Sequence, residues 1–345
     1  MMALFEQESQ MKVTVLCGGV GGAKFLEVLD RWNTQHGSPH ELTAVVNVGD
    51  DFTHLGLRVS PDIDSVVYRL AGLNNPVHGW GRRDETHRVA QEVARHLPEV
   101  TWFELGDLDI ANCAMRTHLL HEGHTLSEVT ARLASSYGVG VRVLPVTDDP
   151  VPTLVQLPAE GSDPASLSVD APGGQGITVL FQEWWVQRKA QPVPLGFVSH
   201  GAGEAHPAPG VLDAIAHADL VLIAPSNPVV SITPLLAIPG VRQALTSTSA
   251  RVVGLSPLIG GRPVRGYADT CLAAVGVEST SAGVAGMYGA RQEGGLLDGW
   301  LIDAGDEQDF AATSIGQRVS WRALPLIFGQ GNDEVIAAAA LSVDL

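Results

Sequence analysis

The sequence predicts an α/β fold: a Rossmann-like, mostly parallel sheet with helices on both faces and a β-rich insert. Two observations support this prediction. Helical and strand-type patterns alternate along most of the 345 residues, and a glycine-rich turn directly follows the first strand pattern. Hydrophobic residues make up 45% of the chain, which is enough for a sizeable core.

The region 11–149 carries the α/β pattern first. Residues 12–17 (KVTVLC) form a short apolar run of strand type, and glycines follow at once. Residues 23–32 then have helical spacing, and residues 42–48 (LTAVVNV) indicate a second buried strand. Strand, glycine turn and helix in this order are typical of the opening of a nucleotide-binding sheet.

The pattern continues with further helices and one more strand. Residues 62–70 and 84–97 have amphipathic helical spacing. Thr125–Glu128 is a capping box that predicts the start of a helix, and Gly138 predicts its end. Residues 141–146 are a third strand candidate.

Composition changes near residue 150. Residues 150–200 contain short alternating segments broken by turns, such as Pro172–Gly174, and we expect a β-rich insert there. The α/β pattern resumes in residues 201–345, with strand candidates at 219–224 and 252–255.

Charge and cysteine content limit the possible partners and location. The net charge is -17, from 38 acidic and 21 basic residues, so neither nucleic acid nor anionic membrane is an expected partner. The three cysteines form no CxxC pair, as expected for reduced core thiols in a cytoplasmic protein. Residues 1–10 are polar and acidic, and we expect a loose leader before the α/β region begins near Met11.

The glycine loop is the first candidate for chemistry. Gly18, Gly19, Gly21 and Gly22 place bare backbone between a strand and a helix, where amides can approach a diphosphate. The spacing matches neither the strict dinucleotide fingerprint nor a Walker loop, so a purely structural turn stays open. Lys24 can add positive charge there, although an exposed helix lysine explains it equally well.

Acid pairs form the second candidate. Four pairs lie at or near predicted strand ends and turns, where ligands of an α/β sheet bind, and such oxygen ligands suit Mg²⁺. Any single pair could instead cap a helix or turn. The pairs are Asp50 with Asp51, Asp62 with Asp64, Asp107 with Asp109, and Asp148 with Asp149.

The first two pairs are the preferred site, because one short loop separates them. Converging carboxylates need a cation or shared protons, so we expect Mg²⁺ ligands among Asp50, Asp51 and Asp62. Asp64 in a first helical turn is assigned to orienting and deprotonating an acceptor hydroxyl. Asp50 is counted with it among the catalytic acids.

Two further segments have side chains suited to ligand binding. Ser226 and Asn227 follow a buried strand, and Ser231 lies in the next helical stretch, so they could bind a phosphate or a base; ordinary capping is the alternative. Trp184 and Trp185 lie in a predicted strand, which would direct them to opposite faces. One, for which we choose Trp184, could stack on a flat ring, although both could be core residues.

These motifs together resemble the 2-phospho-L-lactate transferase family of coenzyme F420 biosynthesis. The resemblance runs from about residue 11 to 327, and its form is most similar to an actinobacterial branch that uses an enolpyruvyl donor. It rests on ten segments in order: GGVGGAKF, VVNVGDD, SPDID, GWG, FELGDLD, LPVTDD, FQEWWV, APSNPVVSI, SPLIGG and GVEST.

The resemblance implies a Mg²⁺-dependent transfer between two small-molecule substrates. A phosphorylated three-carbon acid, phosphoenolpyruvyl or 2-phospholactyl, moves from a guanosine diphosphate carrier to the terminal ribityl hydroxyl of the deazaflavin Fo. GMP leaves, and (dehydro) coenzyme F420-0 forms. A homodimer is left open.

The sequence departs from the family pattern near the third acid pair. Leu108 stands where the family usually has Arg, Ala111–Cys113 replaces a more polar Ala-Thr-His, and Pro150–Pro152 is atypical after the fourth pair. These departures bear on acceptor binding.

Two other interpretations are weighed. One is a nucleotide-sugar-binding regulatory protein of the related gluconeogenesis-factor type. That family resembles this chain in the glycine loop and in residues 47–51, but it lacks the SPDID and QEWW segments. A Rossmann dehydrogenase needs an acid some 20 residues after the glycines, whereas Asp50 comes about 28 residues after Gly22.

Overall fold

The computed structural model describes residues 10–36, 40–159 and 176–342. The expected leader, apart from its last residue, and the expected Pro172–Gly174 turn lie outside these ranges.

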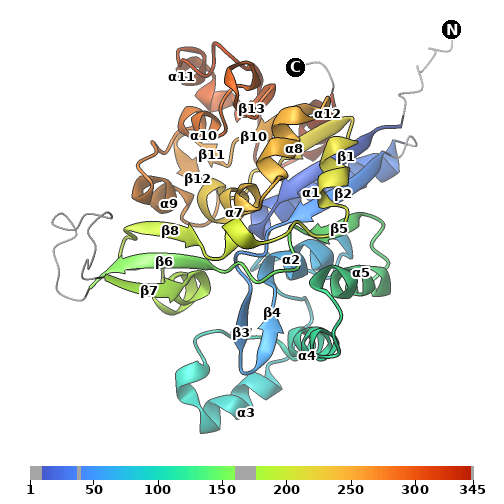
Figure 1. Ribbon diagram of the computed structural model, residues 1–345, viewed down its shortest axis with the longest axis vertical. Coiled ribbons are helices and arrows are strands. Elements are labelled where there is room, and N and C mark those ends of the chain that lie inside the picture. The colour runs from blue at the N-terminus through green and yellow to red at the C-terminus, as the bar shows by residue number, and fades with distance from the viewer. Residues whose placement is uncertain (1–9, 37–39, 160–175, 343–345) are drawn as a thin grey trace.

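A seven-stranded parallel sheet forms the centre of the molecule and confirms the predicted α/β class (Figure 1). The strand order is β14-β13-β10-β9-β1-β2-β5, so the chain builds outward from β1 in one direction and then returns to β1's other side. The strands are β1 (Lys12–Cys17), β2 (Glu41–Val46), β5 (Arg142–Pro145), β9 (Leu220–Ile223), β10 (Arg251–Leu255), β13 (Gly299–Asp303) and β14 (Ser320–Leu324).

Helices pack on this sheet in two groups. α1 (Gly19–Gln35) contacts α2 (Pro61–Leu70) and α12 (Asp333–Leu341), and its predicted apolar face, which includes Phe25 and Leu29, is buried. The second group is α6, α7 and α8. The remaining helices and their bounds are α3 (Arg88–His96), α4 (Asp107–His121), α5 (Leu126–Ser136), α6 (Val211–Ala216), α7 (Thr233–Ala237), α8 (Val241–Ser247), α9 (Ala268–Ala274), α10 (Ser281–Tyr288) and α11 (Glu307–Ala311).

Smaller elements project from the carboxyl ends of the central strands. β3 (Phe52–His54) and β4 (Leu57–Val59) form a hairpin that packs on α4. An antiparallel sheet of order β7-β6-β8 lies within residues 150–200; its strands are β6 (Thr153–Pro158), β7 (Gly176–Leu180) and β8 (Gly196–Ser199). β11 (Leu258–Ile259) and β12 (Arg262–Pro263) form a second hairpin. Figure 1 shows the first hairpin with α3 and α4 at one end of the molecule.

Local sequence signals placed most elements well, with three differences. α1 begins at Gly19, inside the glycine loop rather than after it. α3 begins only at Arg88, because the residues before it form a loop. The predicted strand around the two tryptophans is wrong, since residues Glu183–Gln187 form a π-helix. The capping box at Thr125 is present as predicted.

Apolar side chains on both faces of the central sheet form one large core cluster, and a small second cluster lies under the β3–β4 hairpin. Within the described residues, no single helix has both the length and the apolarity to cross a bilayer. One bent pair of helical segments, Pro228–Ala237 with Val241–Ser247, reaches that length and apolarity when the two segments are counted together.

Candidate active site

One large cavity opens at the carboxyl ends of the central strands and has a volume of about 1240 Å³. Segments that follow β1, β2, β9, β10 and β14 all contribute to its wall. Its centre lies between β1 and β9, where the strand order reverses direction. Ligands of open α/β sheets bind at such a switch point.

The glycine loop lies at this switch point. Gly18, Gly19 and Gly21 line the cavity. The Ser226 hydroxyl donates to the Gly18 carbonyl oxygen at 2.7 Å and accepts from the Gly18 amide at 3.1 Å, so it fixes both polar groups of that residue. Gly22 does not line the cavity; a Cβ there would lie 2.5 Å from Ser226 Oγ, so its role is close packing.

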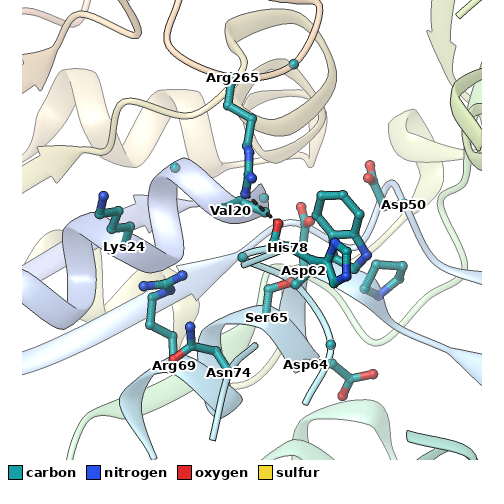
Figure 2. A pocket seen from close by; sticks show the side chains of 18 of the residues that line it. Val20, Lys24, Asp50, Asp62, Asp64, Ser65, Arg69, Asn74, His78 and Arg265 are labelled. Atoms are coloured by element: carbon teal, nitrogen blue, oxygen red, sulfur yellow. Dashed lines mark hydrogen bonds between the residues drawn. The ribbon is translucent and has the colours of Figure 1, made fainter. Parts of the chain in front are cut away.

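Asp50 and Asp62 converge beside the glycine loop. Asn47 Nδ2 donates to Asp62 Oδ2 at 2.9 Å and to Asp50 Oδ1 at 3.3 Å, and Gln182 Nε2 donates to Asp50 Oδ2 at 3.0 Å. Both carboxylates are buried and line the cavity (Figure 2). Burial raises the pKa of Asp62 to about 6, and burial together with the charge of Asp62 raises the pKa of Asp50 well above its ordinary value.

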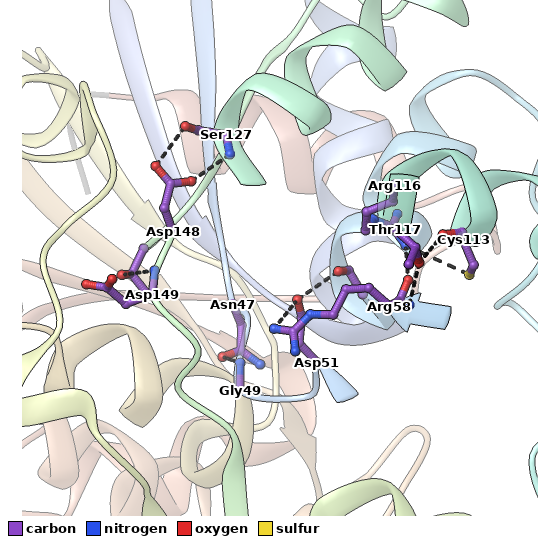
Figure 3. Close-up of polar contacts among 12 residues, drawn as sticks. Asn47, Gly49, Asp51, Arg58, Cys113, Arg116, Thr117, Ser127, Asp148 and Asp149 are labelled. Atoms are coloured by element: carbon purple, nitrogen blue, oxygen red, sulfur yellow. Dashed lines mark hydrogen bonds and ion pairs between the residues drawn. The ribbon is translucent and has the colours of Figure 1, made fainter. Parts of the chain in front are cut away.

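Asp51 does not join this pair, which corrects its expected place among the magnesium ligands. Its Oδ2 accepts from Ser60 Oγ at 2.7 Å and pairs with Arg58 at 3.5 Å, and its side chain is 1% exposed (Figure 3). Successive residues at the start of the β3 hairpin point apart, so only one of the two acids reaches the cavity. Among the described residues, no group of three or more His, Cys, Asp or Glu is placed to hold a metal ion.

Asp64 lines the cavity and forms an ion pair with Arg116, whose side chain is 1% exposed. Burial raises the pKa of Asp64, and the Arg116 guanidinium opposes that shift. The arginine also holds the carboxylate in place, because it donates to the Arg58 carbonyl oxygen as well. The role of Asp64 as a base stays a prediction.

The other polar candidates near the loop have mixed roles. Lys24 Nζ lines the cavity and donates to the Phe328 carbonyl oxygen at 2.9 Å. Asn227 also lines the cavity, yet its side chain accepts hydrogen bonds from the amides of Val229 and Val230. It therefore caps the helix that follows, which was the alternative to ligand binding. Ser231 is buried and lines the cavity.

Trp184 is a core residue, so its expected stacking role is wrong. Its side chain is fully buried, and its indole nitrogen donates to the Pro192 carbonyl oxygen at 2.9 Å. The π-helix, rather than a strand, places the neighbouring Trp185 in the cavity wall. There its ring packs edge-on against Tyr267, with the two ring centroids 5.1 Å apart.

Sequence reasoning missed several basic and aromatic residues of the wall. Arg265 donates to the carbonyl oxygens of Val77 and His78 and lies 5.5 Å from the ring of Trp80, so it links two walls of the cavity (Figure 2). Arg69 and Arg82 line the cavity too. These arginines are far apart in the sequence and meet only in the fold, so the GWG motif, which marks one of the loops, was the usable signal.

The remaining two acid pairs differ in whether they reach the cavity. Asp148 accepts from the Ser127 amide at 2.6 Å and from the Ser127 hydroxyl at 2.9 Å (Figure 3). Asp149 accepts from the His206 amide at 2.7 Å. Asp107 accepts from Thr86 Oγ1 and from the amides of Arg88 and Val89 at the start of α3. Asp109 alone of these lines the cavity.

The departures from the family pattern lie outside the cavity wall. Leu108 is 42% exposed and does not line the cavity. Cys113 is buried in the small cluster under the β3–β4 hairpin.

The fold and the cavity define an α/β protein with a ligand-sized site at the carboxyl ends of its parallel strands, and comparison with known proteins identifies its family. The family model described as 2-phospho-L-lactate transferase CofD matches residues 13–321. The chain therefore belongs to this family, and it is a transferase of coenzyme F420 biosynthesis.

Individual relatives narrow the assignment. The chain is 47% identical over 305 residues to a phosphoenolpyruvate transferase of Mycobacterium sp. (strain KMS), covering 86% of this chain and 89% of that protein. It is 44% identical over 331 residues to a protein of the same name from Mycobacterium tuberculosis (strain ATCC 25177 / H37Ra), covering 93% and 95%.

A solved structure supports the fold alone. A member of the UPF0052 family from Bacillus halodurans superposes with a TM-score of 0.57 at 17% identity, covering 97% of this chain and 100% of that one.

Proposed function

We propose that the protein transfers a phosphorylated three-carbon acid from a guanosine diphosphate carrier to a hydroxyl of the deazaflavin Fo, with release of GMP. The observation that carries this proposal is the convergence of Asp50 and Asp62 on one amide of Asn47 beside the glycine loop. The names of the mycobacterial relatives favour phosphoenolpyruvyl as the acid, and 2-phospholactyl is the alternative.

The glycine loop suits the diphosphate of the donor. Gly18 and Gly19 lie in the cavity wall at the N-terminus of α1, where the helix dipole favours an anion. Lys24 and Arg69 add positive charge on the same wall. A strongly acidic protein needs such local charge to hold a phosphate-bearing substrate.

Asp50 and Asp62 fit a magnesium ion. Burial raises the pKa of both carboxyl groups, and the charge of Asp62 raises the pKa of Asp50 further. A divalent cation would favour the charged form of both. Mg²⁺ in such sites takes one or two carboxylates and completes its shell with water and substrate phosphates, so the third ligand that Asp51 does not supply is not required. When bound, it would offset the negative charge of the diphosphate.

The protein's own groups would act mainly by positioning, as is usual for transfer at phosphorus. The acceptor hydroxyl oxygen forms a bond to the phosphorus that carries the three-carbon acid. The bond between that phosphorus and the bridging oxygen breaks, and GMP leaves with the electron pair. Asp64, held by Arg116, would orient the hydroxyl and take its proton.

The cavity is large enough for both substrates together, since typical ligand pockets are about 300–1,000 Å³ and this one is about 1240 Å³.

The three cysteines are buried free thiols, which supports a reducing, cytoplasmic location.

The test is a direct assay with purified protein, Fo, Mg²⁺ and each guanosine-activated acid, following GMP release and product mass. We expect stoichiometric GMP and phosphodiester product, with the enolpyruvyl donor preferred. Donor binding without turnover in any combination would refute the transferase proposal and favour a regulatory protein.

A further inference from the structure

The helix α2 runs along the cavity and connects two distinct polar regions. Asp62 in its first turn belongs to the phosphate end, and Tyr68, six residues later, also lines the cavity. At 1.5 Å per residue these two positions are about 9 Å apart along the helix. The far region, formed by Tyr68, Arg82 and Asp109, has no role in holding the donor in the function proposed above.

Asp109 is the carboxylate of this far region, and the start of α4 fixes its position. The two Glu85 carboxylate oxygens accept from the amides of Leu108 at 2.9 Å and Asp109 at 3.0 Å. Gly106 leaves room for this contact, because a Cβ there would lie 2.3 Å from Glu85 Cδ. Asp109 is therefore held on rigid backbone at the cavity wall.

A hydrogen-bonded chain supports Asp109 from behind. The Tyr68 hydroxyl donates a hydrogen bond to the Asp109 carboxylate. The Tyr68 hydroxyl accepts from Asn112 Nδ2 at 2.7 Å, and Asn112 Oδ1 accepts from the Tyr137 hydroxyl at 2.9 Å. Arg82 then donates to that hydroxyl at 2.8 Å and lies over the rings of both tyrosines.

Two atoms in this network lack partners among the described residues. Asp109 Oδ1, an acceptor, and Arg82 Nε, a donor, are both buried without a hydrogen bond. Both side chains line the cavity. A buried polar atom without a partner costs about 1–3 kcal/mol, so such atoms in a cavity wall indicate where a ligand supplies the missing groups. Arg82 is near enough for its charge to lower the pKa of Asp109. An acceptor and a donor in one part of the wall complement a ligand edge that carries an N–H group next to a carbonyl.

We propose that Asp109 is a specificity-determining residue for the acceptor, and that its free oxygen accepts a hydrogen bond from the imide N–H of the acceptor's flat ring. Arg82 faces the adjoining carbonyl oxygen. The identity of the acceptor rests on the proposed function. In this arrangement the ring binds at the Tyr68 end, and the hydroxyl chain extends along α2 toward Asp62 and Asp64.

The charges around Asp109 determine how this contact depends on pH. Burial, then the charges of Asp64 and Glu85, raise the pKa of Asp109 to about 6, whereas Tyr68 and Arg82 hold it lower. The carboxylate is the better acceptor, so acceptor affinity should weaken as the pH falls below about 6.

The test measures Fo binding by its own fluorescence, without donor or metal. Asp109→Ala should raise the Kd for Fo about 10–100-fold, the range expected for loss of a hydrogen bond to a charged group. Asp109→Asn should also weaken binding, because one amide oxygen must serve both Tyr68 and the ligand. The KM for the donor should stay within about twofold.

Asp30→Asn is the matched control, since Asp30 is also a helical carboxylate whose pKa burial raises, and it does not line the cavity. It should leave the Kd for Fo unchanged. Fo methylated at the imide nitrogen should bind wild type at least about tenfold more weakly than Fo, and should be nearly insensitive to Asp109→Ala.

The outcomes separate the two proposals. A folded Asp109→Ala variant with an unchanged Kd for Fo overturns the role of Asp109 while leaving the transferase proposal intact. If the variants do not fold, equal binding of Fo and its methylated analogue to wild type overturns it instead. If wild type does not bind Fo at all, both proposals fall.

Discussion

Two adjacent strands of the central sheet end in nearly the same sequence, yet their acids have different roles. β2 is followed by Val-Gly-Asp-Asp, ending at Asp51, and its neighbour β5 by Val-Thr-Asp-Asp, ending at Asp149. In each case a polar side chain before the acids accepts a hydrogen bond from a backbone amide. Asn47 accepts from Gly49 in the first, and Thr147 accepts from Asp149 in the second. Both turns thus use a side chain–amide hydrogen bond, although the two bonds lie at different positions of the motif.

The difference lies in what surrounds each turn. β2 is next to β1, so Asp50 reaches the cavity beside the glycine loop. β5 is an edge strand, and its acids lie outside the cavity wall, where they accept hydrogen bonds from Ser127 and His206. A strand-end acid is thus a candidate ligand only where the strand order brings it to the cavity, and the following substitutions test this rule.

Asp62→Asn should have the largest effect. It removes one of the two converging charges, and we expect kcat to fall about 10³-fold with a shifted Mg²⁺ titration, as for loss of a preorganised electrostatic group. Steady-state GMP release measures this effect, with circular dichroism as the check on folding. Normal kinetics in a folded variant would contradict the role of the pair.

Gly18→Ala should disturb the same pair without removing a charge. A Cβ at Gly18 would lie 2.6 Å from Asp62 Oδ2 and 2.9 Å from Asn47 Cβ, so the carboxylate must move. We expect kcat/KM to fall about 10–100-fold, because small displacements in a reacting site are costly. Gly140→Ala is the control: its Cβ would meet no atom within 4 Å, and its activity should be normal.

Asp109→Asn should change stability in a pH-dependent way. The folded-state pKa of Asp109, about 6, exceeds the ordinary 3.8, so wild type loses stability as the pH rises through this window. The neutral variant avoids that loss, and above pH 6 it should be more stable by on the order of 2 kcal/mol. Denaturant unfolding at pH 4 and pH 8 measures the difference.

Asp149 offers the opposite sign, because hydrogen bonds from His206 lower its pKa. Its contribution to stability is present above the ordinary pKa and is lost as the pH falls. Asp149→Asn should therefore be less stable than wild type at pH 8 but not at pH 3. The same trend in Asp109→Asn and Asp149→Asn would remove the distinction between the acid in the cavity wall and the acid outside it.

Asp148→Asn should have the smallest effect. It weakens the contacts to Ser127 at the start of α5, and we expect a loss of about 1 kcal/mol, as for a helix-end hydrogen bond. Activity per folded molecule should match wild type. A large drop in kcat would place a functional acid on the edge strand after all.

Much of the fold could be predicted because it depends on local patterns. Residues 12–17 form β1 as expected, and the capping box at Thr125 begins α5. The site was harder, because it depends on which strands become neighbours. Asn47 joins Asp50 to Asp62 only since β2 lies beside β1, and nothing local in the sequence distinguishes Asp50 from Asp148.

The tryptophans show a different limit. The alternation of side chains along a strand required an extended backbone, and the π-helix at Glu183–Gln187 removes that premise. Which tryptophan becomes core depends on contacts with distant residues, such as Pro192 for Trp184 and Tyr267 for Trp185.

The position of β1 in the sheet has a consequence for synthesis of the chain. One edge of β1 pairs with β2, which follows it closely, but the other pairs with β9, about 200 residues later. At roughly 5–20 residues per second, that edge waits about 10–40 s for its partner on the ribosome. Because an open apolar edge invites pairing with other chains, slowed elongation between β5 and β9 should increase aggregation of the nascent protein.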